Sequence, residues 1–489
     1  MSVDLKQLKE RLEDKGLLVS WPEGIKDIEN ITYDSRLVKD NTLFICKGLK
    51  FNVQYLEDSI AKGATAYLSE NDYKVKIPAI IVNDVRKALA IVSAVYYTYE
   101  ADKLKLIGIT GTAGKTTVAY MINSILNAHE NSRTGLITTV ECYDGTEAVE
   151  ANMTTPESME LQRMFRNMVD NNVHYATMEV TSQSYKMDRV YGLNFDVGIF
   201  LNISPEHISP IEHESFEEYL ECKLQLMKNS KTAIISAETQ EFETVEKTAR
   251  ANCDKTIIVG FKPEVGDIWY QDVKKLDLGY SFVVKDKEGW ILNVKIANDG
   301  DFNIKNAMIA IATARNFGVD DKAICEGLEN VMVPGRMNAF RHHGSNVYVD
   351  YAHNKESLEA LLKWLHEEFP DKTVNVVMGS AGRANYVRRN QIGDALAGFA
   401  DFAYLTEEDP EYEDPQVTCE DLAKRIKGSK CRYEIITNRE EAIKTAMNRM
   451  TDKDVVAILG KGTERFTKLN GKYLPCKSDA DIVMENQKK

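Results

Sequence analysis

The segment LKLIGITGTAGKTTVAYMINSILNA, residues 104–128, decides the fold of this chain. It begins with a short apolar run, Leu104–Ile109, that is typical of a buried parallel strand. A loop of small residues, 111–114, follows, and beyond it apolar residues recur at the spacing of one helix face. The order is therefore strand, glycine loop, helix. In this arrangement the loop N–H groups and the helix N-terminus point at one place and favour an anion.

The residues after the loop predict a phosphate site. Lys115 supplies a positive charge for the outer phosphates of a nucleotide, and the hydroxyl of Thr116 is suited to ligate Mg²⁺. The strict pattern G-x-x-x-x-G-K-[ST] is not met, because Ile109 occupies the position of its first glycine. The alternative is an ordinary glycine turn between a strand and a helix. We favour a phosphate loop, because the strand, Gly-Lys-Thr-Thr and the amphipathic helix are in register.

Length, charge and cysteine content limit the remaining possibilities. The 489 residues are enough for about three domains. A net charge of −14 argues against a nucleic-acid or anionic-membrane surface. The eight cysteines are scattered without a C-x-x-C pair, which in so long a chain indicates reduced thiols rather than a disulfide framework. With neither a signal peptide nor a membrane-spanning run in the sequence, we expect a cytoplasmic protein without nucleic-acid or membrane partners.

Three α/β regions follow one another along the chain. Residues 1–102 form a small unit joined by a charged linker, Glu100–Lys103, to residues 103–333, which surround the glycine loop. Residues 334–489 form another unit of alternating strands and helices. The clearest strands are expected at 43–46, 66–68, 79–82, 174–180, 195–202, 346–349, 374–378, 401–405 and 455–459, and a helix over 85–97.

Nine short motifs, in order along the chain, carry a resemblance to a known family. They are YDSR (33–36), TGTAGKTT (110–117), TTPES (154–158), MEVTSQ (178–183), NISPEHI (202–208), FNIKNA (302–307), PGRM (334–337), DYAHN (350–354) and GKGTE (460–464). Together they resemble the Mur ligases, the ATP-dependent amide-forming enzymes of peptidoglycan precursor synthesis, and among them the MurE-type tripeptide synthetases. One departure is Ala113, where most members carry Asn or Lys.

The resemblance implies a fold and a reaction. The fold has an N-terminal UDP-sugar-binding domain (1–102), a central P-loop parallel-sheet ATPase domain (103–333) and a Rossmann-like C-terminal amino-acid-binding domain (334–489). In the family reaction a substrate carboxylate attacks the γ-phosphate of ATP, and an amine then displaces phosphate from the acyl phosphate. Because two anions meet, cations including Mg²⁺ must neutralise the site.

The resemblance also implies the catalytic and metal-binding residues. Thr116 and Glu179 are expected to ligate one Mg²⁺, and His207 helps to bind a second. Lys223 occupies the position that MurE-type enzymes carbamylate with CO₂, which turns a cation into an anionic oxygen ligand. With Lys115, these residues form the expected catalytic set. The simpler alternatives are a capping glutamate, a structural histidine and a solvated helix lysine.

Two further groups of residues are implied to bind the substrates. The ATP-binding group is Gly111, Thr112, Ala113, Gly114, Lys115, Thr116, Thr117, Asn306, Arg336, Asp350 and His353. The group for the UDP-sugar-peptide is Ser35, Thr154, Thr155, Ser182 and Arg189. Their simpler alternatives are turn-capping hydroxyls and structural salt bridges.

The added amino acid is predicted from charge. In meso-diaminopimelate-adding members a signature resembling D-N-P-R supplies an Arg for the distal carboxylate, whereas here Glu411 follows Asp409-Pro410. An acidic pocket attracts a distal ammonium, which favours L-lysine. Two residues keep meso-diaminopimelate open: Arg383 can contact a carboxylate, and Glu464 resembles the residue that holds the amino end in diaminopimelate enzymes. L-Ornithine is a shorter alternative. A solvated acidic loop is the simpler reading.

We therefore expect a monomeric ligase that takes ATP, Mg²⁺, UDP-N-acetylmuramoyl-L-alanyl-D-glutamate and a diamino acid. A related enzyme such as folylpolyglutamate synthetase is the nearest rival, and the YDSR unit argues against it. A P-loop regulator without ligase activity is the rival from another class. For such a regulator Glu179, His207 and Lys223 would be superfluous.

Overall fold

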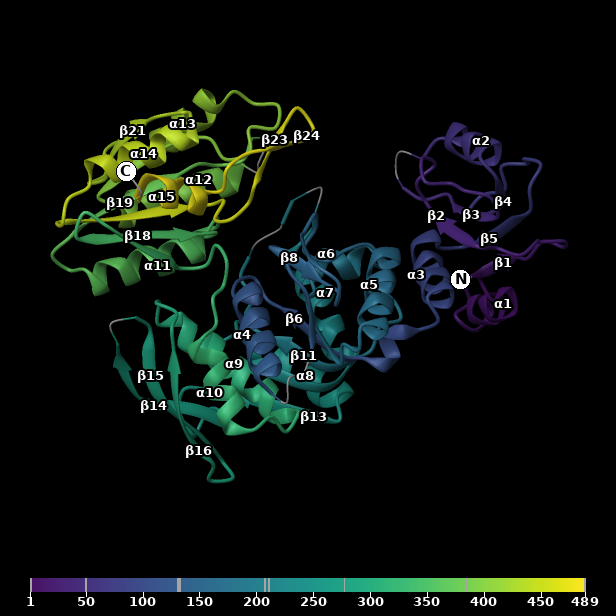
Figure 1. Cartoon of the computed structure of the whole chain (residues 1–489), viewed down its shortest axis with the longest axis horizontal. Coiled ribbons are helices and arrows are strands. Elements are labelled where there is room, and N and C mark those ends of the chain that lie inside the picture. Colours follow the sequence, from purple (N-terminus) through teal and green to yellow (C-terminus); the bar gives the residue numbers. More distant parts are fainter. Residues whose placement is uncertain are drawn as a thin grey trace. The chain divides into compact units, whose positions relative to one another are not determined.

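The computed structural model describes residues 2–48, 51–129, 133–205, 208–209, 212–276, 278–382 and 386–487. These form two compact units (Figure 1). The first contains the chain up to Tyr270 with Lys285–Ile291 and Met308–Gly327, and the second contains Gln271–Val284, Leu292–Ala307 and the chain from Leu328 onward. The α/β fold class is confirmed by three separate sheets with flanking helices. The domain boundaries at 102/103 and 333/334 stay predictions.

The N-terminal sheet has five strands in the order β1-β5-β4-β3-β2. Strands β2 (Asn30–Thr32), β3 (Thr42–Ile45), β4 (Ala64–Ser69) and β5 (Ala79–Val82) are parallel, and β1 (Leu18–Ser20) is antiparallel to β5. Helices α1 (Leu5–Asp14) and α3 (Val85–Tyr96) cover one face through Leu8, Leu12, Ala88 and Val92, while α2 (Val53–Ala61) covers the other through Leu56. The carboxyl ends of β2 to β5 therefore share one edge, the place where parallel sheets collect ligands.

The linker expected at Glu100–Lys103 is more ordered than its charge indicated. It forms the 3-10 helix η1 (Glu100–Lys103), and the side chain of Glu100 is buried. Its carboxylate lies 2.7 Å from Lys103 Nζ and 3.0 Å from Arg166 Nη1. Ion pairing permits the burial, so the connection between the first two sheets is a fixed turn.

The central sheet is built around β6 (Lys105–Thr110), which lies between β10 (Tyr175–Glu179) and β11 (Phe195–Phe200), all parallel. The order continues outward through β7 (Thr134–Ile137), β8 (Glu141–Tyr143) and β9 (Ala148–Glu150) on one side, and through β12 (Ser230–Ser236) and β13 (Lys255–Val259) on the other. Helix α4 (Lys115–Ala128) packs on β6, β7 and β10, and α7 (Phe216–Lys228) packs on β6, β11 and β12. The strand–loop–helix prediction for residues 104–128 is confirmed.

The remaining elements before residue 334 are divided between the two units. Helices α5 (Ser158–Asp170), α6 (Ser182–Lys186), α8 (Phe242–Asn252), α9 (Phe302–Asn316) and α10 (Asp321–Glu329) connect the strands. Between residues 231 and 300 the chain is rich in strands: β12 and β13 are followed by β14 (Ile268–Lys275), β15 (Tyr280–Asp286) and β16 (Ile291–Ile296).

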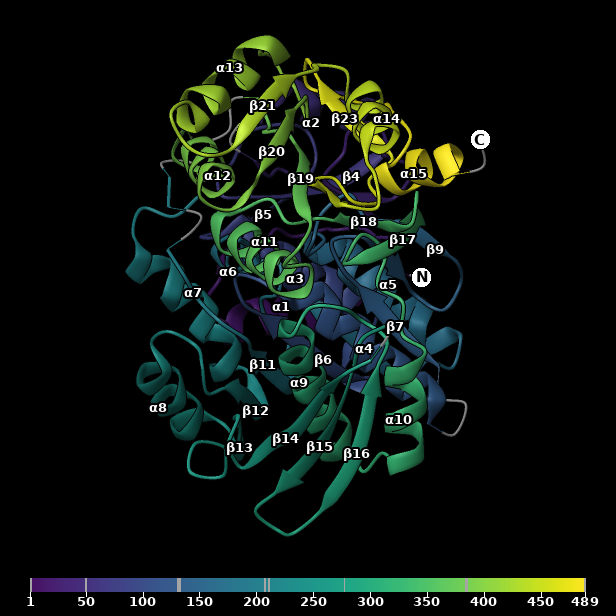
Figure 2. The same cartoon turned by 90° about the vertical axis from the view of Figure 1, so that its left-hand side faces the viewer.

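The C-terminal sheet has the order β17-β18-β22-β19-β20-β21 (Figure 2). Its strands are β17 (Asn338–His342), β18 (Ser345–Asp350), β19 (Thr373–Met378), β20 (Phe402–Leu405), β21 (Arg432–Ile435) and β22 (Asp454–Leu459), of which only β17 pairs antiparallel. Along β19, Val374 and Val376 face one buried cluster and Val377 faces another. This alternation indicates a sheet buried on both faces.

Helices on both faces of this sheet supply the two clusters. Helices α11 (Lys355–Glu368), α12 (Tyr386–Phe399) and α13 (Pro415–Ile426) cover one face, and α14 (Arg439–Arg449) and α15 (Asp479–Gln487) cover the other (Figure 2). A hairpin, β23 (Phe466–Leu469) and β24 (Lys472–Pro475), follows β22. This is the doubly wound, Rossmann-like arrangement that was expected.

The eight cysteines carry thiols rather than disulfides, and Cys46, Cys142, Cys419 and Cys431 are buried. Within the described ranges, every helix is too short or too polar to span a lipid bilayer.

Candidate functional site

A cavity of about 280 Å³ lies beside the glycine loop of the central sheet. Residues from five segments line it: the loop, the TTPES stretch, helix α6 with its flanks, residues 212 and 213, and helix α7. It brings together seven residues predicted from sequence, namely Gly111, Lys115, Thr154, Thr155, Ser182, Arg189 and Lys223. Residues more than one hundred positions apart thus converge at the carboxyl ends of β6, β10 and β11, where ligands of parallel sheets bind.

The glycine loop has the backbone geometry that its sequence indicated. At Gly111 a Cβ atom would lie 2.9 Å from the Cβ of Leu201, so the loop passes too close to β11 for a side chain. Gly114 caps helix α4 with a φ of 86°, in the left-handed region. Helix α4 then begins at Lys115, which directs its first N–H groups at the cavity.

Asn202 braces this loop, a role that the sequence analysis missed. Its Oδ1 accepts hydrogen bonds from the backbone N–H groups of Thr112 and Ala113, both at 2.9 Å, and its Nδ2 donates to the carbonyl of Ala113 at 3.1 Å. The hydroxyl of Thr112 also accepts from the N–H of Ser204 at 3.1 Å. The loop is therefore held in one conformation by the end of β11.

Two lysines meet at the first residue of the loop. Lys115 Nζ donates to the carbonyl oxygens of Gly111 and Thr112 at 2.9 and 3.1 Å. Lys223 Nζ donates to the same Gly111 oxygen at 2.8 Å and lies 4.7 Å from the ring centroid of Tyr219. Lys223 is only 2% exposed, so the alternative of a solvated helix lysine is wrong. Two positive charges at one oxygen make this end of the cavity attractive to a polyanion.

Thr116 and Glu179 form the oxygen-rich pair expected of a magnesium site. The hydroxyl of Thr116 donates to Glu179 Oε1 at 2.7 Å, and Glu179 is 1% exposed. Thr139 donates to both carboxylate oxygens of Glu179, through its N–H at 3.0 Å and its hydroxyl at 3.2 Å. A buried carboxylate beside a hydroxyl fits Mg²⁺, which prefers oxygen ligands and keeps several waters. His207, expected to hold a second ion, lies outside the described residues.

The far side of the cavity carries hydroxyls and an arginine. The Thr155 hydroxyl donates to the carbonyl of Glu179 at 2.9 Å, and the Thr154 hydroxyl accepts from Thr139 at 3.1 Å. Arg189 donates to Glu157 Oε1 at 3.1 Å and to the carbonyl of Thr155 at 3.3 Å. Arg189 therefore already has a carboxylate partner, and this partner fixes the guanidinium at the cavity wall.

His213 is a second residue that the sequence analysis missed. It is 1% exposed, lines the cavity, and its Nε2 lies 2.9 Å from the hydroxyl oxygen of Ser182. Its Nδ1 lies 3.7 Å from Glu218 Oε2, and Glu218 also pairs with Lys186. His213 thus orients the predicted substrate-binding hydroxyl of Ser182 from behind. His213 lies 31 positions from Ser182 and outside the nine motifs, so no signal in the sequence pairs the two residues.

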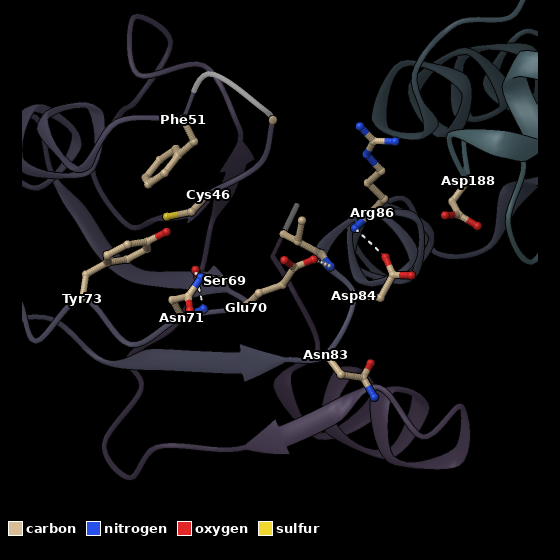
Figure 3. Close-up of a pocket in the computed structure, with 12 residues that line it drawn as sticks. Cys46, Phe51, Ser69, Glu70, Asn71, Tyr73, Asn83, Asp84, Arg86 and Asp188 are labelled. Atoms are coloured by element: carbon tan, nitrogen blue, oxygen red, sulfur yellow. Dashed lines mark hydrogen bonds between the residues drawn. The ribbon is translucent and has the colours of Figure 1, made fainter. Parts of the chain in front are cut away.

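A larger cavity, about 650 Å³, lies at the carboxyl edge of the N-terminal sheet (Figure 3). The rings of Phe51 and Tyr73 are stacked obliquely on one wall, 5.5 Å between centroids. The remainder of the lining is polar and includes Ser69, Glu70, Asn71, Asn83, Asp84, Arg86 and Asp188. This lining combines flat aromatic surface and amide groups with one cation and three carboxyl groups.

Asp188 lies on the wall of this cavity, in the direction of Arg86 (Figure 3). Burial raises its pKa to about 6, helped by the charge of Asp84 and opposed by Lys87 and Arg86. Ser35 is not among the residues that line either cavity. Its carbonyl accepts a hydrogen bond from Lys62 Nζ at 2.8 Å.

In the second unit, a charged cluster joins the EEDPE and GKGTE segments. Lys461, 3% exposed, donates to Asp409 Oδ1 at 2.9 Å and to Glu464 Oε2 at 3.0 Å. Tyr351 donates its hydroxyl to the other oxygen of Glu464 at 2.8 Å. The predicted residues Asp409 and Glu464 therefore do lie together, with Lys461 between them.

Glu408 is the least satisfied member of this cluster. One carboxylate oxygen lies 3.5 Å from Arg388 Nη2, and the other is buried without a hydrogen-bond partner in the described part of the chain. That oxygen lies 3.1 Å from where a Cβ on Gly460 would be, so it faces the GKGTE segment. Burial raises the pKa of Glu408, opposed by Arg388 and Lys461.

The other residues predicted for this unit lie apart from the charged cluster or have structural partners. Glu411 is half-buried with φ 55°, and its backbone pairs with Lys468 and Asn470. Asp350 is buried and accepts from the N–H groups of Met337 and Ala352, both at 2.7 Å. Arg383 lies outside the described residues.

The remaining residues predicted to bind ATP lie in the same unit and have local partners. Arg336 lies over the Tyr351 ring, and His353 Nδ1 is 2.8 Å from the carbonyl of Tyr351. The amide of Asn306 donates to Asn303 Oδ1 at 2.9 Å. Their role toward ATP stays a prediction.

Comparison with known proteins identifies the family to which the two main parts of the chain are similar. Residues 109–314 match the Mur ligase middle domain, and residues 335–462 match the Mur ligase, glutamate ligase domain. Over 481 residues the chain is 39% identical to a UDP-N-acetylmuramoyl-L-alanyl-D-glutamate--L-lysine ligase of Enterococcus faecalis, covering 96% of this chain and 94% of that one.

Two further comparisons agree. A UDP-N-acetylmuramyl-tripeptide synthetase of Lactobacillus acidophilus is 38% identical, over 94% of this chain and 92% of that protein. A solved UDP-N-acetylmuramoyl-L-alanyl-D-glutamate--2,6-diaminopimelate ligase superposes with a TM-score of 0.68 at 24% identity, over 98% of each chain. At that identity the superposition speaks for the fold alone.

Proposed function

Because the chain belongs to the Mur ligase family, we propose that it joins L-lysine to UDP-N-acetylmuramoyl-L-alanyl-D-glutamate with ATP. The bond formed is an amide, made in peptidoglycan precursor synthesis through an acyl phosphate. The proposal rests on the charged cluster of the second unit, in which one oxygen of the buried Glu408 carboxylate has no hydrogen-bond partner among the described residues. The names of the two curated relatives support the same reaction.

One carboxylate oxygen of the cluster supports lysine over meso-diaminopimelate. The acids of the cluster are Glu408, Asp409 and Glu464, and its cations are Lys461, Arg388 and Lys468, whose Nζ lies 3.9 Å from Asp409 Oδ2. If all six are ionised, the charges cancel, but among the described residues one oxygen of Glu408 is left without a hydrogen-bond donor. L-Lysine brings one net positive charge at neutral pH, whereas meso-diaminopimelate brings none. A buried charge requires a partner, and the side-chain ammonium of lysine supplies it.

The cavity beside the glycine loop is proposed to hold the reacting ends of the two other substrates. Lys115 and the first N–H groups of α4 face it and suit the phosphates of ATP. Thr116 and Glu179 would hold Mg²⁺, which withdraws electron density from the transferring phosphoryl group. Lys223 would supply a further oxygen ligand once carbamylated. The hydroxyls of Thr154, Thr155 and Ser182 and the guanidinium of Arg189 suit the peptide and its carboxylates.

The larger cavity of the N-terminal sheet is proposed to take the uridine end of the substrate. The Phe51–Tyr73 wall suits a pyrimidine ring, the amides of Asn71 and Asn83 suit its polar edge, and Arg86 suits a diphosphate. Ser35, predicted for this role, comes from the same sheet edge but not from the lining of the cavity. We also propose that the enzyme is a cytoplasmic monomer, which size-exclusion chromatography with light scattering tests.

The experiment is product analysis. The protein is incubated with ATP, Mg²⁺, UDP-N-acetylmuramoyl-L-alanyl-D-glutamate and, in turn, L-lysine, meso-diaminopimelate, L-ornithine or no amino acid. We expect phosphate release and a new species heavier by one lysyl residue, with both amounts equal. Phosphate release that does not depend on the UDP-dipeptide would instead support a P-loop regulator. A diaminopimelyl product formed in preference would contradict lysine but not the ligase.

A further inference from the structure

A buried ion pair lies behind the charged cluster of the second unit. Arg439 is the first residue of α14 and Asp479 the first residue of α15, and they are 7% and 1% exposed. The guanidinium donates through Nε and Nη2 to the two carboxylate oxygens of Asp479, both at 2.7 Å. The pair is therefore bidentate and almost completely removed from water, the strongest form of such a contact.

The remaining donors of Arg439 point at two backbone carbonyls. Nη2 donates to the carbonyl of Leu459 at 2.8 Å, and Nη1 donates to the carbonyl of Glu407 at 3.2 Å. Leu459 ends β22 and directly precedes the GKGTE segment, while Glu407 directly precedes Glu408. One guanidinium therefore holds the starts of both segments that carry the cluster.

We infer that Arg439, fixed by Asp479, is a positioning residue for the amino-acid site, and that the last helix, α15, is part of the support of that site. This inference rests on the proposed function. Glu408 must stay near Gly460 and Lys461 for the charges of the cluster to balance. Arg439 sets this spacing, because both carbonyls bind to the same planar group.

Physical cost favours a positioning role over a purely stabilising one. A cation at the N-terminus of a helix is opposed by the helix dipole. Burial of an ion pair also costs desolvation that its attraction often fails to repay. Since Arg439 incurs both costs, packing alone does not account for it. The two carbonyl contacts do, because an apolar side chain of similar size would leave both oxygens buried and unpaired.

The test compares two variants with two matched controls. Asp479→Asn removes the charge that fixes the guanidinium, and Arg439→Lys keeps the positive charge but loses the planar fork. Asp481→Asn makes the same change two residues along α15, where Asp481 pairs with the exposed Arg465. Arg449→Lys makes the same change at the other end of α14, where Arg449 pairs with the exposed Glu434.

Two readouts separate positioning from folding. The first is the KM for L-lysine in full turnover. The second is hydroxamate formation, in which hydroxylamine replaces the amino acid and traps the activated carboxyl group without using the lysine site. We expect Asp479→Asn and Arg439→Lys to raise the KM for lysine by about 10-fold or more, the range for lost supporting contacts. Hydroxamate formation should stay within about 2-fold of wild type, and both controls should behave as wild type in both readouts.

The other possible results contradict either the positioning role of Arg439 and Asp479 or the proposed function. An unchanged KM for lysine in the two variants would overturn the positioning role. A loss of hydroxamate formation as large as the loss of lysine-dependent turnover would also overturn it, because the pair would then serve folding alone. A wild-type protein that forms no hydroxamate from the UDP-dipeptide would contradict the proposed function instead.

Discussion

Lys115 and Lys223 donate hydrogen bonds to the same oxygen, the carbonyl of Gly111, at 2.9 and 2.8 Å. Two ammonium groups on one neutral acceptor repel each other. This repulsion favours any change that separates them or brings an anion between them. The phosphates of ATP would draw Lys115 away from the loop, and carbamylation of Lys223 would replace its positive charge by a negative one. Both proposed events reduce the same electrostatic repulsion between the two ammonium groups.

Lys115→Ala should lower kcat by about 10²-fold or more, the scale of losing one electrostatic stabiliser of the transferring phosphoryl group. The fold should survive, because the half-exposed Lys115 side chain donates to the carbonyls of Gly111 and Thr112 in its own loop rather than packing into a core. Steady-state kinetics and circular dichroism check both statements. Lys105→Ala, on the exposed start of β6, is the control. Near-normal turnover in a folded Lys115→Ala protein would exclude the phosphate role.

Lys223→Ala should be nearly inactive at ambient bicarbonate, and a short carboxylic acid in solution should restore part of the activity by supplying the missing oxygens. Intact-protein mass spectrometry under CO₂ tests the modification separately. Lys228→Ala changes a solvent-facing lysine of the same helix that pairs with Glu221, and it should retain activity. Full activity of the Lys223→Ala enzyme would show that the residue serves packing alone.

Glu411→Arg should shift preference from L-lysine toward meso-diaminopimelate, because it reverses a charge two residues along the chain from Asp409. The backbone at Glu411 has φ 55°, which arginine adopts at a cost of about 1 kcal/mol. Competition between the two amino acids at equal concentration measures the shift. Glu420→Arg, an equal change of charge on the exposed side of α13, should leave the ratio unchanged. An unaltered ratio in Glu411→Arg would refute the charge argument.

Asp188→Asn should stabilise the protein above pH 6. Burial raises the pKa of Asp188 to about 6 in the folded state, from the ordinary value of 3.8. A raised carboxyl pKa means that the folded state favours the proton. The stabilising contribution is therefore full below pH 3.8 and is lost as the pH rises through about 6. Asparagine keeps the positive φ of this position at little cost.

Thermal unfolding between pH 4 and 8, without ligands, checks the prediction for Asp188. The variant should unfold at a higher temperature than wild type at pH 7 to 8, and the two curves should converge near pH 4. Asp58→Asn, on the exposed side of α2, is the control. Parallel curves at every pH would contradict the assignment of the titration to Asp188.

Local patterns predicted those parts of the structure that depend on neighbours in sequence. The phosphate loop follows from an apolar run, glycines and a helical stripe, whereas the pairing of Thr116 with Glu179 is implied by the family resemblance. By contrast, Asn202 and His213 act across 89 and 31 positions of chain, to Ala113 and Ser182. Single polar residues of this kind carry no periodic signal. Their partners become known only when the strands are assembled.

The same limit applied to the amino-acid site. Acidic composition pointed to the EEDPE segment, but charge counting along the chain could not tell that Lys461 donates to both Asp409 and Glu464. Nor could it tell that one oxygen of Glu408 has no hydrogen-bond partner in the part of the chain that the structure describes. It also could not tell that Glu413 is committed to Arg389, at 2.7 Å. The helix η1 at Glu100–Lys103 differs from the expected linker for the same reason, since Arg166 lies 66 positions away.

The buried cysteines make the local opening of each part of the protein measurable by thiol alkylation. Burial raises the pKa of the thiols of Cys46, Cys142 and Cys419 to about 12, so they stay protonated and unreactive in the folded state. Each belongs to a different sheet region: N-terminal, central and C-terminal. Alkylation of each thiol, followed by mass spectrometry, therefore times the opening of its own region. A substrate that stabilises one region should slow the alkylation of the cysteine in that region and leave the alkylation rates of the other two unchanged.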